Sequence, residues 1–188
     1  MALFVIVAGV MLDSVVKLFL TFSSSYFRLI HLPPAAFGIV GASLGGLGLL
    51  VAPLARRLVG SGSVARNYLI VAVVVAGGLI GVAYRWDLWG FVFMFPLGAA
   101  MMALGYIVSY YLNALADSSH RATVLSFKGM AFNLGYGFVS LVFAVVLREM
   151  RDGGDAQEAV GRALTFLPAW VASASRCACC CFGGMVVL

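Results

Sequence analysis

The sequence predicts an all-α, polytopic membrane protein, and three observations carry that expectation. Apolar residues make up 63% of the 188 residues and charged residues only 10%, whereas soluble domains carry about 25% charged residues. The mean hydropathy is +1.08. The apolar residues fall into long runs, and a run of about 20 such residues crosses the hydrocarbon core as a helix. A chain of this length has room for about six spans.

The six apolar runs are separated by Arg, Pro, Gly and Asp residues. We expect spans at about 2–22, 36–56, 67–85, 89–112, 123–148 and 163–188. The first loop, Ser23 to Pro34, ends in Pro33-Pro34, and proline suits the first turn of a helix. Gly153-Gly154 break the chain after the fifth span, and Asp155 with Glu158 has the spacing of a helix-capping box before the sixth.

The basic excess is interpreted as loop charge that orients the chain in a bilayer. The formal net charge is +5, and no basic cluster is longer than Arg56-Arg57. That cluster is far short of the cationic stripe that binds a phosphate backbone, so nucleic acid is not an expected partner. With the N-terminus in the cytoplasm, the second and fourth loops carry Arg56, Arg57, Arg66, Arg121 and Lys128, whereas the first and third carry Arg28 and Arg85.

The positive-inside rule therefore predicts a cytoplasmic N-terminus, although the fifth loop places Arg148, Arg151 and Arg162 on the other side, among four acidic residues. The expected cytoplasmic loop and gating residues are Arg56, Arg57, Arg121 and Lys128.

Charged side chains inside the first span form the strongest functional signal. Asp13 and Lys17 stand one helical turn apart, with Thr21 one turn further on the same face. Each charge costs about 2.5–3.5 kcal/mol at a helix centre, which nearly cancels the gain from the apolar residues of the span. We therefore expect this face to meet other helices or a water-filled cavity. The alternative is an Asp13–Lys17 ion pair that serves only membrane insertion.

Two further spans carry polar faces. In the fourth span, Tyr106, Ser109, Tyr110 and Asn113 share one face, and in the fifth span Ser126, Asn133 and Ser140 follow a heptad spacing, with Tyr136 nearby. Interhelical hydrogen bonds, worth about 0.6 kcal/mol each, are the alternative explanation. The expected solute or ion path is lined by Asp13, Lys17, Tyr106, Tyr110, Asn113, Asn133 and Tyr136.

The second and third spans differ from these. Between Leu69 and Val82 the third span holds only Leu, Ile, Val, Ala and Gly, so it has no polar face. In the second span, Gly41 and Gly45 match the small-xxx-small spacing that allows close helix contact.

No metal or cofactor site is predicted, and an enzyme is not expected. His31 and His120 lie in loops without a Cys, Asp or Glu at ligand spacing, and the spans lack a Ser/His, paired-Asp or His-Glu-x-x-His arrangement. All four cysteines fall between Cys177 and Cys181, in an atypical end at residues 171–188. We interpret this end as an altered terminus; palmitoylation and metal binding are the alternatives, and thiols so closely spaced poorly supply a tetrahedral site.

Two segments resemble motifs of the bacterial major facilitator superfamily of transporters. Residues 113–127, Asn-Ala-Leu-Ala-Asp-Ser-Ser-His-Arg-Ala-Thr-Val-Leu-Ser-Phe, followed by Asn133-Leu-Gly-Tyr-Gly, resemble the junction of its tenth and eleventh helices. Pro53-Leu-Ala-Arg-Arg-Leu-Val-Gly is similar to its cytoplasmic Gly-x-Leu-Ala-Asp-Arg-x-Gly loop. Pro53 and Arg56 replace the glycine and the aspartate, so the gating salt bridge associated with that aspartate is not carried over to this chain.

The resemblance covers about residues 1–170, which would be helices seven to twelve, the C-terminal half. It implies a six-helix domain of two inverted three-helix repeats that moves a small solute by alternating access in the cell (inner) membrane. Coupling to H⁺ is left open. One half cannot alternate access alone, so the resemblance implies an N-terminal half or a second copy as partner. The alternative function is a non-transporting membrane fragment or a six-span scaffold or homodimer.

Overall fold

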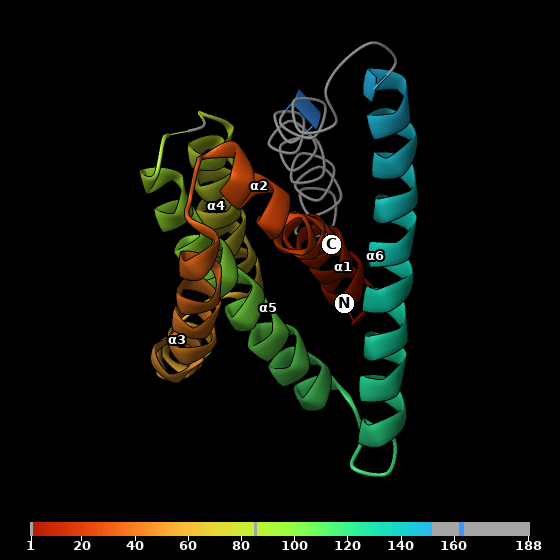
Figure 1. Ribbon diagram of the computed structural model, residues 1–188. Helices are drawn as coiled ribbons and strands as arrows, with labels where there is room; N and C mark the ends of the chain where they lie inside the picture. Colours follow the sequence, from red (N-terminus) through yellow and green to blue (C-terminus); the bar gives the residue numbers. More distant parts are fainter. Residues whose placement is uncertain (1, 85, 152–161, 164–188) are drawn as a thin grey trace.

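The computed structural model describes residues 2–84, 86–151 and 162–163 (Figure 1). Within that part of the chain every regular element is helical, which confirms the all-α class. Four of these helices are long and apolar enough to cross a membrane, or five if a bent pair at the start counts as one span. The chain is therefore a multi-pass membrane protein. The sixth predicted span, 163–188, and the Cys-rich end, 171–188, lie outside the described residues except for residue 163.

The first span is a helix pair bent by 54°, made of α1 (Ala2–Thr21) and α2 (Ser23–Leu29). The prediction of a loop from Ser23 to Pro34 is therefore wrong for Ser23–Leu29, which is helical. The cause is packing, because Tyr26 and Phe27 of α2 are buried and the Tyr26 ring meets Phe19 edge-on at 5.5 Å. Burial of these aromatic rings outweighs the modest helix propensity of the serines that begin α2.

The second span, α3 (Pro34–Ser61), is longer than predicted. Its N-cap is Pro33 and its first residue Pro34, as the proline pair indicated. At the other end the helix runs on through Pro53, so residues 53–60, which resemble a loop, are helical. Only Gly62 and Ser63 separate α3 from α4 (Val64–Ala83), and the Ser63 side chain caps α4 by accepting the Arg66 N–H.

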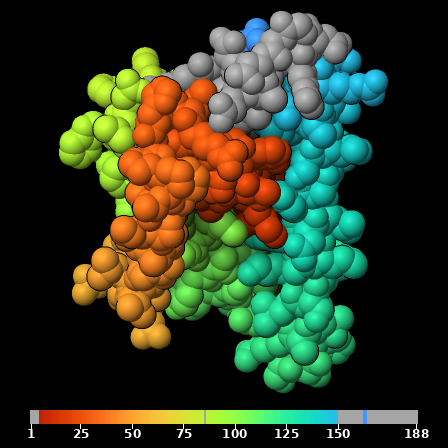
Figure 2. Space-filling model, viewed as in Figure 1, coloured from red at the N-terminus to blue at the C-terminus, as the bar shows by residue number. Residues whose placement is uncertain are grey.

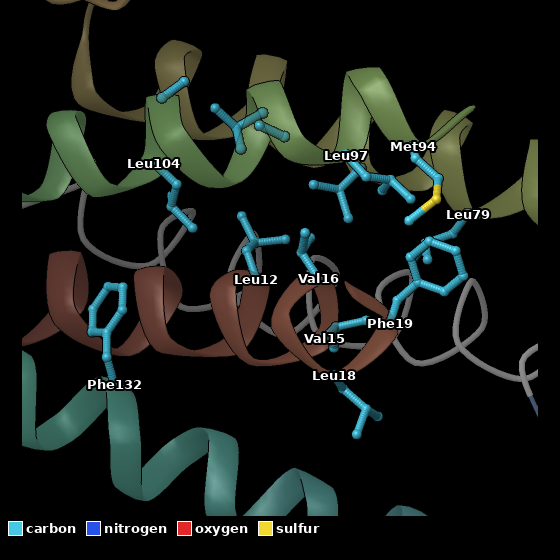
Figure 3. Close-up of a cluster of buried hydrophobic side chains, with 14 of the residues drawn as sticks. Leu12, Val15, Val16, Leu18, Phe19, Leu79, Met94, Leu97, Leu104 and Phe132 are labelled. Carbon is cyan, nitrogen blue, oxygen red and sulfur yellow. The ribbon is translucent and has the colours of Figure 1, made fainter. Parts of the chain in front are cut away.

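The remaining elements are a short 3₁₀ helix, η1 (Trp89–Phe93), then α5 (Met94–Leu115) and α6 (Arg121–Arg151). α5 is the central helix, and it packs against α1, α3, α4 and α6. α1 lies between α5 and α6, so its apolar side chains meet both (Figure 3). Leu12 and Leu104 are buried between α1 and α5, and Phe132 of α6 closes the other side of α1.

Glycines set how closely three of these helix pairs approach. A Cβ on Gly135 of α6 would overlap Val10 of α1, and one on Gly98 of α5 would lie 3.0 Å from Leu44 of α3. A Cβ on Gly81 of α4 would overlap Phe93. The close contact expected at Gly41 and Gly45 is not found, because a Cβ at either position would meet no described atom within 4 Å.

Successive helices alternate in direction, and hydrogen bonds identify the two ends of the bundle. At one end the Tyr68 hydroxyl donates to the Val5 carbonyl at 2.7 Å, which joins the starts of α4 and α1. At the same end Asn67 Nδ2 donates to the Tyr111 hydroxyl at 2.8 Å, which joins the start of α4 to the end of α5. At the other end the Leu88 N–H donates to the Ile30 carbonyl at 3.1 Å.

Large apolar side chains cover the outer faces of α3 and α6. Those that are more than half exposed on these helices are Ile39, Leu49, Leu50, Leu54, Met130, Leu134, Phe138, Leu141 and Val145. A water-soluble monomer rarely exposes apolar patches this long. These faces suit contact with lipid chains.

The glycine contact between α1 and α6 can be tested by adding one methyl group. Gly135→Ala should lower the free energy of unfolding by about 1–3 kcal/mol, because the new Cβ overlaps a β-branched side chain with little rotamer freedom. Gly137→Ala on the same helix is the control, since a Cβ there meets nothing and helix propensity favours alanine by about 1 kcal/mol. Thermal unfolding in detergent measures both, and equal shifts would contradict the packing described.

Candidate functional site

An open cavity of about 480 Å³ lies among α1, α3, α5 and α6. In Figure 2 the surface is hollowed between α3 and α6, with α5 behind and α1 above. The cavity is lined by Asp13, Lys17, Leu20, Leu44, Gly45, Gly98, Met101, Met102, Gly105, Lys128, Gly129, Phe132 and Asn133.

α1 contributes two charged side chains to the cavity. Asp13 is buried, with 6% of its surface exposed, and Lys17 is half-buried one turn further along the helix. Both side chains line the cavity, on one face of α1. An apolar helix that carries a carboxylate and an ammonium in its middle is tolerated only where those groups find polar partners or water.

Lys17 joins two of the predicted polar faces. Its Nζ donates to Asn133 Oδ1 of α6 at 3.1 Å, and it lies 5.1 Å from the centroid of the Tyr136 ring. One turn further on, Thr21 Oγ1 and the Tyr136 hydroxyl are 3.1 Å apart. The contact between α1 and α6 therefore continues as a polar seam from the cavity toward the end of α1.

Lys128 lies in the cavity, whereas the sequence indicated a cytoplasmic loop. It stands two turns inside α6, and its Nζ donates to Ser109 Oγ at 2.7 Å and to the Gly105 carbonyl at 3.1 Å, both on α5. The ammonium also lies 5.3 Å from the Phe132 ring centroid.

The alternative of an Asp13–Lys17 ion pair is not what the structure shows. Among the described residues, no ion pair within 4.0 Å joins Asp13 to either lysine. The carboxylate instead interacts through space with both Lys17 and Lys128. Three charged groups therefore face one cavity without neutralising each other by contact.

The other predicted path residues lie outside the cavity lining. Tyr110 is 48% exposed, and its ring stacks edge-on against Tyr111 at 5.8 Å. Tyr106 packs half-buried against the apolar core, and Asn113 is half-buried near the end of α5. From that face of α5, Ser109 is the residue that reaches the site, through Lys128.

The predicted gating arginines lie at the end of the bundle that holds the α3–α4 turn. Arg56 and Arg57 are exposed on the last turns of α3, and Arg121 is exposed at the first residue of α6. None of the three lines the cavity. The structure therefore places these cations at the same end of the bundle and apart from Lys128.

Sequence reasoning missed the position of Lys128, yet a signal for it was present. Lys17 and Lys128 are the two lysines of the sequence, and both lie inside apolar runs. The arginines of the described residues lie instead near helix ends or in connections. This separation of the two cation types would have singled out Lys128 as a cavity residue.

A buried amide at the α3–α4 turn was also missed. Asn67 is fully buried, and its Nδ2 donates to the Leu58 carbonyl at 3.0 Å as well as to the Tyr111 hydroxyl. It ties the end of α3 to the end of α5. Because buried hydrogen bonds of this kind fix helix positions, we regard Asn67 as a structural brace for the site.

Comparison with protein families, with curated proteins and with solved structures gives no match. Within the described ranges, no group of three or more His, Cys, Asp or Glu residues is placed to hold a metal ion.

Water access to the cavity can be measured with single cysteines in a chain whose four native cysteines are replaced by alanine. Met102→Cys, on the cavity wall, should react with a water-soluble, membrane-impermeant thiol reagent in open bilayer fragments. Leu134→Cys, on the outer face of α6, should react at least tenfold more slowly, because lipid keeps the thiol from forming a thiolate. Equal reactivity at the two positions would contradict a wet cavity enclosed by lipid-facing helices.

Proposed function

We propose that this chain forms one half of a secondary transporter that moves a small solute across a membrane by alternating access. The observation that carries the proposal is the cavity in which Asp13, Lys17 and Lys128 meet inside apolar helices. Each such charge costs about 2.5–3.5 kcal/mol at a helix centre. Charged groups kept at that cost inside a membrane typically mark a substrate or ion pathway.

The shape of the cavity supports a half-transporter. It is open on the side between α3 and α6, so the described helices supply one wall of a path (Figure 2). Transporters with paired halves bind their solute near the bilayer midplane between the halves, and rocking of the halves exposes it alternately to each side. An N-terminal half of the major facilitator type, or a second copy of this chain, would supply the opposite wall.

Asp13 supports coupling of transport to H⁺. It is the carboxyl group of the cavity, and intramembrane carboxyl groups serve as proton carriers in many transporters. A proton on Asp13 would leave the two lysines as the only charges of the lining, so protonation and solute binding would be linked through the same cavity.

The second candidate function is a membrane scaffold that transports nothing. Lys17 with Asn133 and Lys128 with Ser109 are hydrogen bonds between helices, and such bonds can serve packing alone. This candidate predicts that neutral replacements of the charged residues change stability but no solute flux.

The charge distribution favours a cytoplasmic N-terminus, in a cell (inner) membrane. Arg56, Arg57, Arg66 and Arg121 gather at the end that holds the start of α1. The other end carries Arg28, Arg148 and Arg151 together with the acidic Asp87 and Glu149, whereas Asp117 lies at the first end. Short loops rich in Lys and Arg remain on the cytoplasmic side.

This orientation predicts which cysteines an external reagent reaches. Arg121→Cys, at the start of α6, should stay unlabelled when a membrane-impermeant reagent is added to intact cells, and Asp87→Cys, at the opposite end, should be labelled. Permeabilising the cells should equalise the two. Labelling of Arg121→Cys alone in intact cells would reverse the orientation.

Transport is tested in proteoliposomes with radiolabelled carboxylates, amino acids, sugars and amines. The chain alone should insert without mediating uptake, because one wall cannot alternate access. Co-reconstitution with a candidate N-terminal half should give uptake of at least one solute class. Asp13→Asn should then reduce proton-driven uptake about tenfold or more, which corresponds to loss of about 1.4 kcal/mol of interaction.

Asp87→Asn is the matched control for that variant, because it makes the same chemical change in an exposed loop. Its uptake should equal that of the unmodified chain. Robust uptake by demonstrably monomeric chain would contradict the half-transporter proposal, and absence of uptake in every combination would favour the scaffold.

A further inference from the structure

We infer that the cavity selects a small organic anion with an apolar body, such as an aromatic monocarboxylate. This inference rests on the proposed function and names the solute class of the same site. Three features of the cavity point to this solute class: its lining carries a net positive charge, its lysines have unused hydrogen-bond donors, and the other side chains of its wall are mostly apolar.

The charge balance of the lining is positive. Two ammonium groups, Lys17 and Lys128, face the cavity against a single carboxylate, Asp13. Since Asp13 makes no ion pair with a described residue, it offsets the lysines only through space. A cavity with an excess of one sign among apolar walls concentrates solutes of the opposite sign.

Both lysines keep hydrogen-bond donors for a solute. An ammonium carries three N–H donors. Lys17 uses one on Asn133 Oδ1, and Lys128 uses two on Ser109 Oγ and the Gly105 carbonyl. These partners are neutral, so a carboxylate that enters the cavity gains charge-assisted hydrogen bonds, which are stronger than the neutral ones already present.

The rest of the wall fits an apolar body. Leu20, Leu44, Met101, Met102 and Phe132 line the cavity beside the charges. Methionine side chains adapt to irregular ligands, and a volume of about 480 Å³ lies in the range of small-molecule pockets. Two positive anchors against an apolar wall therefore match a molecule with one anionic end and a hydrocarbon or aromatic remainder.

Asp13 takes a defined part in this selection. Its carboxylate repels an anionic solute and attracts a cationic one, so it weakens anion binding while it is ionised. Neutralising Asp13 should therefore tighten anion binding, whereas neutralising either lysine should weaken it. A loss of packing would not tighten anion binding in the Asp13 variant while weakening it in the lysine variants.

Three probes of the same shape and different charge test the inference: benzoate, benzamide and benzamidine. The full chain is placed in phosphatidylcholine nanodiscs, and binding is measured by equilibrium dialysis against empty nanodiscs. Benzoate should bind about tenfold more tightly than benzamide, and benzamidine should bind most weakly. Lys17→Gln and Lys128→Gln should each weaken benzoate binding about tenfold and leave benzamide unchanged, and Asp13→Asn should tighten benzoate binding.

Two controls separate charge from folding. Arg148→Gln removes a positive charge from the exposed end of α6 and should leave benzoate binding unchanged. Lys128→Arg retains the charge and should retain most of the binding, and circular dichroism should show the same helicity for every variant.

Absence of benzoate binding, or benzamidine binding at least as tightly as benzoate, would overturn the inference. Equal changes in benzoate binding for Lys128→Gln and Arg148→Gln would also overturn it. These outcomes leave the transport proposal standing if uptake of another solute class is seen in proteoliposomes. Absence of uptake in every combination tests the transport proposal separately.

Discussion

The cost of placing charges among apolar helices is the constraint on which the rest of the arrangement depends. Lys17 of α1 reaches Asn133 of α6, and Lys128 of α6 reaches Ser109 and Gly105 of α5. These contacts connect three helices around one cavity, so each ammonium group faces polar groups there. Because lipid cannot solvate an ammonium or a carboxylate, any packing that turned these residues outward would lose several kcal/mol.

The apolar contacts determine where the cavity can form. α5 packs on four other helices, and Gly135 and Gly98 allow neighbouring helices to approach closely on either side of the charged residues. At Gly105 and Gly45, by contrast, no described atom fills the space that a side chain would occupy, and both residues line the cavity. Glycine thus acts in two ways, allowing close packing at some positions and leaving open volume at others.

Hydrophobic pattern predicted most of the fold and part of the site. The long apolar runs correspond to α1, α3, α4, α5 and α6, because a bilayer demands helices of that length. Helix periodicity puts polar residues on shared faces, and of these Asp13, Lys17 and Asn133 line the cavity, but periodicity alone does not show that Tyr110 faces outward. The sequence predicts loops at Ser23–Leu29 and directly after residue 56, because the helical state of these segments depends on tertiary packing of Tyr26 and on continuation of α3 to Ser61. The sequence groups Lys128 with Arg121, because it does not show that the Lys128 side chain contacts α5.

In this arrangement Lys17 and Lys128 should face water inside the membrane. Their contact with water can be measured directly, because they are the two lysines of the chain. Selective ¹⁵Nζ-lysine labelling gives two ammonium signals in solid-state NMR of the chain in bilayers, and Lys17→Gln assigns them. Magnetisation that starts on water should reach both ammonium groups much faster than magnetisation that starts on lipid acyl chains. Faster transfer from the acyl chains to either lysine would contradict the cavity and the function proposed from it.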